Sequence, residues 1–413
     1  MVHNKHFKAL VRQRMAKTGE RYTTARRQLL ASQTPIPTAS GVVSGYPRTA
    51  LGATAAAGQY DAALWQRVLA QAGIKNPATN EAFTTAMLAG LGGGIGFMVA
   101  TFAYEEVTTA TVVLRAHPEP YTERMLQRSA VALERTSTTS PRIATQQLDA
   151  TLEADKVSVV RVTHGTLPWV DSDAAEYQDS IDVAIVGRHD EHYLVDGGGP
   201  SLGEDDIEAF RSITSAELAK ARGQRKTDKH WAANITLDQV PISLDELTTN
   251  VRSAMSETTG RLLGTLPLEG IPASWLPKFG VQGMRTWAEL LRDQRTKRGW
   301  PAMFANEQRL QTGLRMVQDT AFGSRWGGPG GLRGLYADFL VEASALPGLG
   351  RVQDAAPIYR QLAPLWDRVM DTIDPEIAAP ERIVLFEEMA QQLDELASLE
   401  EHAAHVLAAS LNH

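Results

Sequence analysis

Few side chains in this sequence could act as a nucleophile. None of its 413 residues is a cysteine, which excludes disulfide bonds, zinc sites built from thiolates and a cysteine nucleophile. Ser201 lies in the pattern G-P-S-L-G at 199–203, which matches the nucleophile elbow of serine hydrolases. Two preceding glycines lengthen that connection, and the start of an ordinary helix would use the same residues. Ser201 is therefore the candidate nucleophile of an alternative, hydrolytic interpretation, with His230 as the nearest base in the sequence.

The histidines and glycines give no complete metal or cofactor site. His402 and His405 share a helix face but supply only half of a metal's ligands, and no H-E-x-x-H pattern is present. The run G-L-G-G-G-I-G-F at 90–97 fails as a dinucleotide loop, because the third glycine position falls on Ile95 and a helical pattern precedes it. We expect neither a metal nor a cofactor. We interpret the glycine run as a helix end followed by close packing.

The most uneven charge lies in residues 1–30. Eight basic side chains against one acid leave +7 there, on a chain whose net charge is −7. We expect residues 1–32 to form a basic helical hairpin that contacts RNA, DNA, a ribosome or an acidic protein, or that packs on the body of the protein. The candidate contacts are Lys5, Lys8, Arg12, Arg14, Lys17, Arg21, Arg26 and Arg27.

Composition places the chain among globular proteins. Hydrophobic residues make up 43% and charged residues 22%, which is ordinary for that class. No apolar run approaches the roughly 20 residues of a membrane helix, and the N-terminus lacks the apolar core of a secretion signal. We therefore expect a cytoplasmic protein without a membrane partner.

Hydrophobic periodicity predicts four regions. After the hairpin, a linker or strap rich in proline and glycine covers 33–57. Helical patterns and then mostly antiparallel strands follow in 58–242, which predicts an α+β domain. We expect a helix over 121–134, a hairpin connection at 188–191 and strands over 97–104, 109–114, 157–163, 182–186, 193–195 and 231–237. Only helical patterns appear in 243–413, so we expect an all-α domain there. Its last helix, expected over 379–410, either packs within the domain or forms a homo-oligomer.

A second glycine-rich loop spans 323–333 and precedes an expected helix. Backbone N–H groups at such a helix start are available to an anion. Arg325 and Arg333 are therefore candidate anion contacts.

Two stretches resemble known domains. Residues 58–221 resemble the butirosin biosynthesis protein H N-terminal family, and residues 281–373 resemble the helical domain of unknown function that often follows it. The first resemblance implies a papain-like cysteine-peptidase fold and acyl transfer from an acyl carrier protein to an aminoglycoside amine. An acyl carrier protein or a small molecule is the partner that it implies. The resemblance rests on G-Q-Y-D-A-A-L-W (58–65), the glycine run, L-P-W (167–169), two strand segments within 182–196 and W-G-G-P-G-G-L-R-G-L-Y-A-D-F-L (326–340).

The departures from the family pattern fall on its catalytic positions. The family has G-x-H-C before its first helix, whereas this chain has Tyr60 and Asp61 for the histidine and the cysteine. The catalytic histidine falls on Ile181, or on Asp182 if the register shifts by one. Only the third member, an acid, is retained as Asp196.

This loss predicts a pseudoenzyme that acts by binding. A carboxylate cannot perform thiolate acyl transfer, and isoleucine cannot exchange a proton. Asp61 either caps the helix that it precedes or forms a carboxylate pair of split pKa values with Asp182 or Asp196. An open polar site would favour an enzyme, and a filled one a scaffold. The expected ligand cleft is lined by Tyr60, Asp61, Gly92, Gly93, Gly94, Trp169 and Asp196.

Overall fold

The computed structural model describes most of the chain. The basic hairpin, Ser201 and Arg325 lie outside the described residues, and so does most of the strap. The described ranges are 41–47, 59–105, 107–118, 120–170, 180–196, 210–224, 227–236, 240–322 and 326–412.

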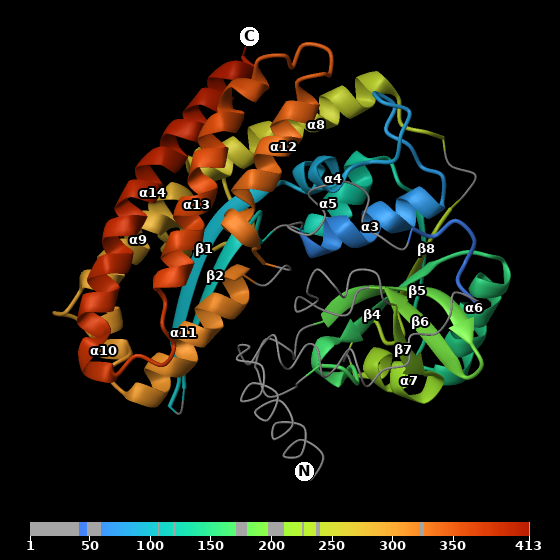
Figure 1. Cartoon of the computed structure of the whole chain (residues 1–413), viewed down its shortest axis with the longest axis horizontal. Helices are drawn as coiled ribbons and strands as arrows, with labels where there is room; N and C mark the ends of the chain where they lie inside the picture. The colour runs from blue at the N-terminus through green and yellow to red at the C-terminus, as the bar shows by residue number, and fades with distance from the viewer. Residues whose placement is uncertain are drawn as a thin grey trace, which may run out of the picture.

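Three short helices lie between two larger parts of the molecule (Figure 1). They are α3 (Tyr60–Gln71), α4 (Thr85–Leu91) and α5 (Tyr121–Arg128). The Gln59 side chain caps α3 by accepting a hydrogen bond from the Ala62 N–H at 2.9 Å. The expectation that Asp61 is the cap is wrong, because Asp61 lies within the first turn. The negative charge of Asp61 is still stabilised by the backbone N–H groups that are exposed at the start of the helix.

A six-stranded sheet forms the right-hand part of Figure 1. It is antiparallel, as the sequence predicted, but its strands at 133–136 and 211–214 were not among the expected ones. Its neighbouring strands are antiparallel, in the order β3-β8-β4-β5-β6-β7. One face packs against α6 (Pro141–Glu153) and α7 (Ser215–Gly223), and the other face joins the main core. The strands are β3 (Leu133–Thr136), β4 (Ser158–Thr163), β5 (Ser180–His189), β6 (His192–Asp196), β7 (Arg211–Thr214) and β8 (Ala232–Ile235), and the short helix η2 (His164–Thr166) follows β4.

Strand β3 corrects a sequence prediction, which extended the helix of α5 to Glu134. The helix ends at Arg128, and Ala130 has a φ of +54°, which an α-helix cannot contain. Leu133 then pairs with Ile235 of β8. Four residues show too few alternations to predict a strand, and the strong helical pattern beside them was therefore extended over this segment.

The strands β1 (Ile95–Ala103) and β2 (Thr108–Arg115) form a separate hairpin. The sequence grouped them with the other strands, but they lie among the C-terminal helices (Figure 1). Phe97 and Leu114 enter the main core, while Met98 and Val113 on the other face form a small cluster with Phe279. The main core therefore runs continuously across the predicted domain boundary at residue 242.

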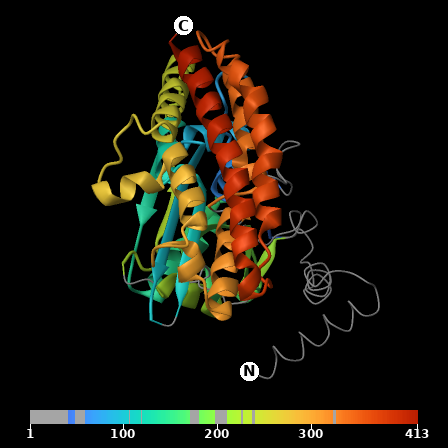
Figure 2. The same ribbon diagram turned by 90° about the vertical axis from the view of Figure 1, so that its left-hand side faces the viewer.

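The C-terminal part is helical, as predicted, and no strand follows β8 within 240–322 and 326–412. The last helix packs inside this part, against α8, α9 and α13, and the segment that contains η5 projects from it (Figure 2). No helix in the described ranges is long and apolar enough to cross a membrane. The elements are α8 (Leu244–Leu262), η5 (Ala273–Lys278), α9 (Gly280–Arg292), α10 (Trp300–Met303), α11 (Glu307–Phe322), η6 (Pro329–Leu332), α12 (Arg333–Ala343), η7 (Val352–Ala355), α13 (Ala356–Thr372), η8 (Ala379–Glu381) and α14 (Arg382–Leu411).

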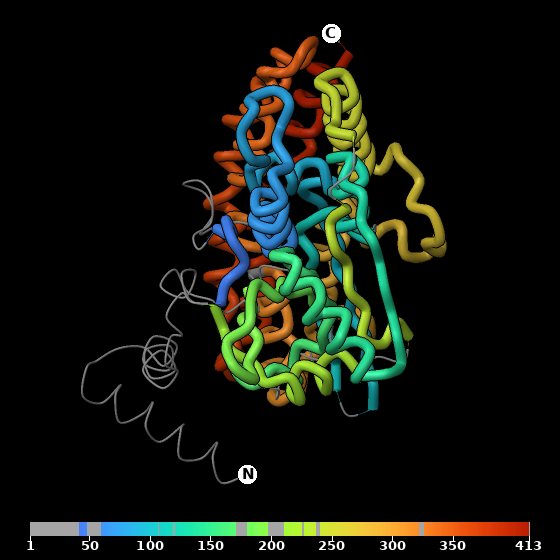
Figure 3. The backbone as a smooth tube through the Cα atoms, turned by 90° about the vertical axis from the view of Figure 1, so that its right-hand side faces the viewer, coloured from blue at the N-terminus to red at the C-terminus, as the bar shows by residue number. Residues whose placement is uncertain are grey.

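Residues 41–47, which we call the strap segment, lie beside α3 and reach the six-stranded sheet (Figure 3). Val42 forms an antiparallel bridge with Gly187 of β5. Val43 and Tyr46 are buried. This part of the predicted strap is therefore a packed element of the protein.

Candidate functional site

Three aspartates surround the N-terminus of α3. Asp61 lies in the first turn of that helix, Asp182 near the start of β5 and Asp196 at the end of β6. Side chains alternate between the faces of a strand, and Ile181 packs in the cluster beneath α6 and α7. Asp182, not Ile181, therefore faces α3. The Tyr60 hydroxyl joins helix and sheet by donating to the Asp182 carbonyl oxygen at 2.7 Å.

Asp61, at the nucleophile position of the resemblance, is held by Arg115 of β2. The guanidinium donates to its carboxylate at 2.8 Å, and the Gln59 side-chain amide donates at 3.2 Å. Both charged residues are largely buried, with 9% of Asp61 and 7% of Arg115 exposed. The guanidinium carbon lies 4.5 Å from the ring centre of Tyr121 and 4.8 Å from that of Trp326. The carboxylate thus has a fixed cation beside it and no imidazole in that place.

Asp182 is bound by Arg161 of β4 through two parallel hydrogen bonds of 2.5 and 2.9 Å. Arg161 also lies over the ring of Trp231, 4.4 Å from its centre. Burial raises the pKa of Asp182, and the charges of Asp61 and Glu123 add to this effect, while Arg161 opposes it. The carboxylate is therefore restrained in geometry and less acidic than an ordinary aspartate.

Asp196 has two partners. Arg67 of α3 donates to both carboxylate oxygens, at 2.6 and 2.9 Å, and the Tyr46 hydroxyl of the strap segment donates at 2.5 Å. Burial and the charge of Asp196 raise the pKa of Tyr46 well above its ordinary value, so the phenol keeps its proton. All three aspartates are therefore paired with an arginine, and the strap segment covers one of them. Within the described residues, each carboxylate therefore already has a cationic partner.

One imidazole near Arg115 was missed by the sequence reasoning. His117 follows β2, and its ring lies edge-on to Trp326 at 5.5 Å between centres. Burial, together with the charge of Arg115, lowers the pKa of His117 to about 4, so it is neutral near pH 7. His230, the base of the serine interpretation, is buried beside α7, where its carbonyl accepts from Arg222 at 2.9 Å. Burial, then Arg222 and Lys229, lower the pKa of His230.

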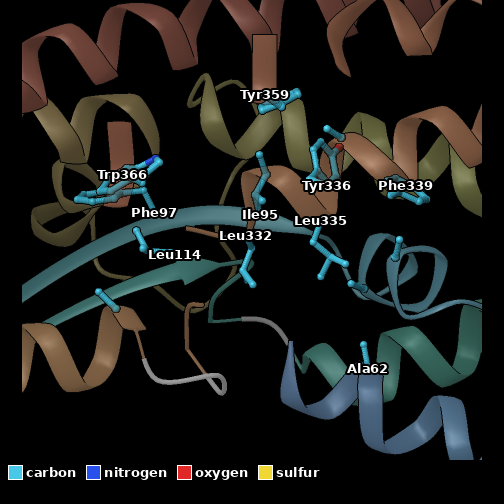
Figure 4. Close-up of a cluster of buried hydrophobic side chains, with 14 of the residues drawn as sticks. Ala62, Ile95, Phe97, Leu114, Leu332, Leu335, Tyr336, Phe339, Tyr359 and Trp366 are labelled. Atoms are coloured by element: carbon cyan, nitrogen blue, oxygen red, sulfur yellow. The ribbon is translucent and has the colours of Figure 1, made fainter. Parts of the chain in front are cut away.

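The glycine run has the role expected of it, a helix end followed by close packing. Helix α4 ends at Leu91, and Gly93 and Gly94 have φ of +111° and +61° before β1 begins. A Cβ atom at Gly90 would overlap the Phe339 ring, and one at Gly94 would lie 2.5 Å from Tyr336. Both rings belong to α12, and Figure 4 shows them beside the start of β1.

Several residues that were expected to line a ligand cleft pack against other parts of the protein. Tyr121 and Tyr336 occupy the space beside Gly92 and Gly94, so the structure gives the glycine run a packing role. Trp169 packs against the cluster that contains Ile181, on the sheet face opposite Asp182. Trp169 therefore does not share a surface with Asp182, and side chains of the protein take the space beside Gly92 and Gly94.

The second glycine loop also differs from its prediction. Arg333 is fully buried, and its guanidinium pairs with Glu400 and donates to the carbonyls of Leu114 and Gly96. The Gly330 N–H donates to the Asp367 carboxylate at 2.6 Å. The chain's own acids thus bind Gly330 and Arg333, so neither is available to an external anion.

Metal ligands do not gather within the described ranges, where no group of three or more histidine, aspartate or glutamate residues could hold an ion. His402 and His405 are exposed on α14. Each of the three aspartates is instead paired with a guanidinium group.

Comparison with known families confirms the resemblance. The model described as butirosin biosynthesis protein H, N-terminal, matches residues 60–197, and the domain of unknown function (DUF4872) matches residues 216–407. Residues 60–197 are thus similar to the butirosin biosynthesis protein H N-terminal family, and the second domain follows them in the chain. The family relation indicates an acyltransferase-like function. No curated protein matches the chain. The second match begins before β8, and so it includes a strand from the interior of the six-stranded sheet.

Proposed function

We propose that this protein, in which residues 60–197 are similar to the butirosin biosynthesis protein H N-terminal family, is non-catalytic and acyltransferase-like and acts by binding a partner or ligand. The observation that carries the proposal is the Asp61–Arg115 pair at the position where the family pattern has its cysteine. A thiol catalyst needs a nucleophile that forms a thioester and a base that exchanges its proton. A carboxylate cannot replace the thiol in that step, and a guanidinium, which keeps its proton in proteins, does not act as the base.

The charge arrangement explains how the site is retained without its chemistry. A thiolate beside an imidazolium is an ion pair, and Asp61 beside Arg115 has the same signs at the same helix end. Arg161 and Arg67 neutralise the other two aspartates in the same manner. The three aspartates around the start of α3 are thereby held in ion pairs, which supports a site that keeps its charges without the thiol chemistry. By resemblance, the bound partner is an acyl carrier protein or a small molecule.

The test is an assay for the lost reaction. The full chain is incubated with an acyl-phosphopantetheine thioester and an amine acceptor, and separately with a peptide library. We expect no turnover above buffer and no difference between the parent chain and Asp61→Ala. Turnover that disappears in Asp61→Ala would overturn the proposal.

The serine alternative is tested separately. A fluorophosphonate probe is expected to leave the full chain unlabelled. A covalent adduct mapped to Ser201 and absent in Ser201→Ala would instead establish a hydrolase or acyltransferase with a relocated nucleophile.

The basic segment supports a second binding role. The charge of +7 within residues 1–30 favours a phosphate-bearing or acidic partner. We expect binding to single-stranded RNA or duplex DNA to weaken steeply with salt and to disappear when residues 1–32 are deleted. Binding that is insensitive to salt, or that survives the deletion, contradicts this role.

A further inference from the structure

The strap segment is bound to the sheet as an added strand. Strand β4 pairs with β5 only as far as Ile185, which leaves the next residues of β5 open on that side. The strap segment continues the pairing there. The Val43 N–H donates to the Val186 carbonyl at 2.8 Å, and the Arg188 N–H donates to the Gly41 carbonyl at 3.0 Å. This is the geometry by which sheets bind extended peptides.

Two side chains of the strap segment are specifically accommodated. Val43 is 5% exposed and Tyr46 is 6% exposed, and both belong to the main core cluster. The Tyr46 ring lies 5.9 Å from that of Phe210, between centres, while its hydroxyl reaches Asp196. The protein thus contacts an aliphatic residue and, three positions later, a tyrosine whose hydroxyl meets a charged acceptor.

The backbones approach so closely that glycine is required on both sides. A Cβ at Gly187 of β5 would overlap the Gly41 carbonyl, and a Cβ at Gly41 would overlap that of Arg188. Gly41 also has a φ of +107°, where other residues are strained. At the far end, the Ser44 N–H donates to Asp155 at 2.8 Å. The fit extends over the whole strap segment.

We propose that residues 41–47 are a tethered ligand. They fill a strand-addition site that accepts an extended peptide with an aliphatic residue and a tyrosine at this spacing. The segment must leave before another molecule can reach the Asp196–Arg67 pair. The inference does not depend on whether the chain is catalytic, because the strap segment would control access to Asp196 in either case.

The first test measures how often the strap segment is released. The chain has no cysteine, so Val43→Cys provides a single thiol whose modification by a disulfide reagent reports exposure. We expect slow labelling in this variant and about tenfold faster labelling when Tyr46→Phe is added, because a hydrogen bond to a charged acceptor is lost. Tyr193→Phe is the matched control, since Tyr193 donates to Asp149 at 2.7 Å elsewhere on the same sheet.

Equal labelling rates in the Tyr46→Phe and Tyr193→Phe backgrounds would overturn the proposal. A second readout avoids the cysteine substitution. In Gly41→Ala, hydrogen exchange should accelerate at the Arg188 N–H, while the amides that pair β4 with β5 keep their protection. Loss of protection across both pairs, or in neither, contradicts a local release.

The second test supplies the ligand in trans. A fluorescent peptide of residues 39–47 is titrated into the full chain and into Gly41→Ala. We expect at least tenfold tighter binding to the variant, because the tethered copy competes at an effective concentration of about millimolar. A peptide with phenylalanine in place of the tyrosine should bind more weakly. Equal binding by the two proteins, or by the two peptides, overturns the assignment.

Discussion

Arginine–carboxylate pairs occur in two regions of this protein that differ in depth and in what they join. In the core, Arg333 and Glu400 both have fully buried side chains, and the Trp366 indole donates to the same carboxylate at 3.0 Å. Around the N-terminus of α3, the paired side chains retain between 8% and 22% exposure. The first pair connects α12 and α14 with carbonyls of the β1–β2 hairpin, and the others neutralise Asp61, Asp182 and Asp196.

The difference separates two uses of the same interaction. A fully buried ion has no access to water, so the loss of its partner leaves a charge that nothing solvates. A partly exposed ion can recover some hydration when its partner is removed. We therefore expect the core pair to determine stability more than the site pairs do. The site pairs determine which charges the site presents.

The strongest test of this comparison is Glu400→Gln. It leaves the Arg333 guanidinium without a counter-charge in the core, and we expect the free energy of unfolding to fall by about 3–5 kcal/mol. The neighbouring Glu401→Gln is the control, because Glu401 pairs with Arg285 where both side chains are 40% exposed, and its cost should stay below about 1 kcal/mol. Urea unfolding followed by circular dichroism measures both. Similar losses of unfolding free energy in Glu400→Gln and Glu401→Gln would contradict the distinction between buried and exposed pairs.

Next in size is the contact between the glycine run and α12. In Gly90→Ala, the added methyl group overlaps the Phe339 ring, and we expect a loss of about 1–3 kcal/mol. Gly334→Ala is the matched control, since nothing lies within 4 Å of the added atom and alanine favours a helix. The control should unfold at the same urea concentration as the parent or a higher one. If Gly90→Ala also unfolded at the parent's urea concentration or a higher one, the close approach of Gly90 to Phe339 would not matter for stability.

Removal of a site charge should cost less than removal of the core charge. Asp61→Asn leaves Arg115 with a neutral neighbour, and a loss of about 1–3 kcal/mol is expected because Arg115 is still largely buried. Asp338→Asn is the exposed comparison, since its partner Arg360 is half exposed. A cost for Asp61→Asn as large as that for Glu400→Gln would show that the two regions are equivalent.

The smallest effect is on the pH dependence of stability. Burial raises the pKa of Asp182 above 3.8, so its favourable contribution is present below that value and is lost as the pH rises through the folded pKa. The pKa of Glu257 has the opposite shift: burial would raise it, but the hydrogen bond and charge of Arg128, with Arg124 and Arg261, hold it below 4.5. That contribution is lost as the pH falls.

Two variants separate these signs. Relative to the parent, Asp182→Asn should become comparatively more stable as the pH rises from about 4 to 6, and Glu257→Gln comparatively less stable over about pH 3 to 5. Thermal or urea unfolding across this range measures the two slopes. If relative stability changed with pH in the same direction in both variants, burial would not dominate at Asp182 while the arginines dominate at Glu257.

Local patterns predicted much of this fold. The C-terminal helices follow from apolar residues at helical spacing, and the antiparallel strands from β-branched runs around the turn at Asp190. The resemblance located Asp61 and Asp196, and the structure placed Asp182 beside them. Sequence patterns could not identify their partners. The paired arginines lie 54, 21 and 129 residues away for Asp61, Asp182 and Asp196, so only the folded chain brings them together.

The same limit applies to burial. Arg333 follows a glycine-rich loop, and nothing in the local sequence distinguishes a surface anion contact from a core cation. The decisive residue, Glu400, is 67 positions away on α14. The β1–β2 hairpin was likewise recognised as two strands, but alternation along a strand does not say which helices cover it.

The placement of β1, β2 and β8 has a consequence for the ancestry of the chain. The first family segment contributes a hairpin to the helical part, and the second contributes β8 to the middle of the sheet. Without the second segment, the β1–β2 hairpin would lose the helices that cover it, and β3 and β4 would lose their partner strand β8. Without the first segment, β8 would have no strand to pair with. The two are therefore poor modules for shuffling between genes. A recombination event that separated the two segments would have to replace both the β1–β2 hairpin and β8 at once. This favours inheritance of the two segments as a single unit.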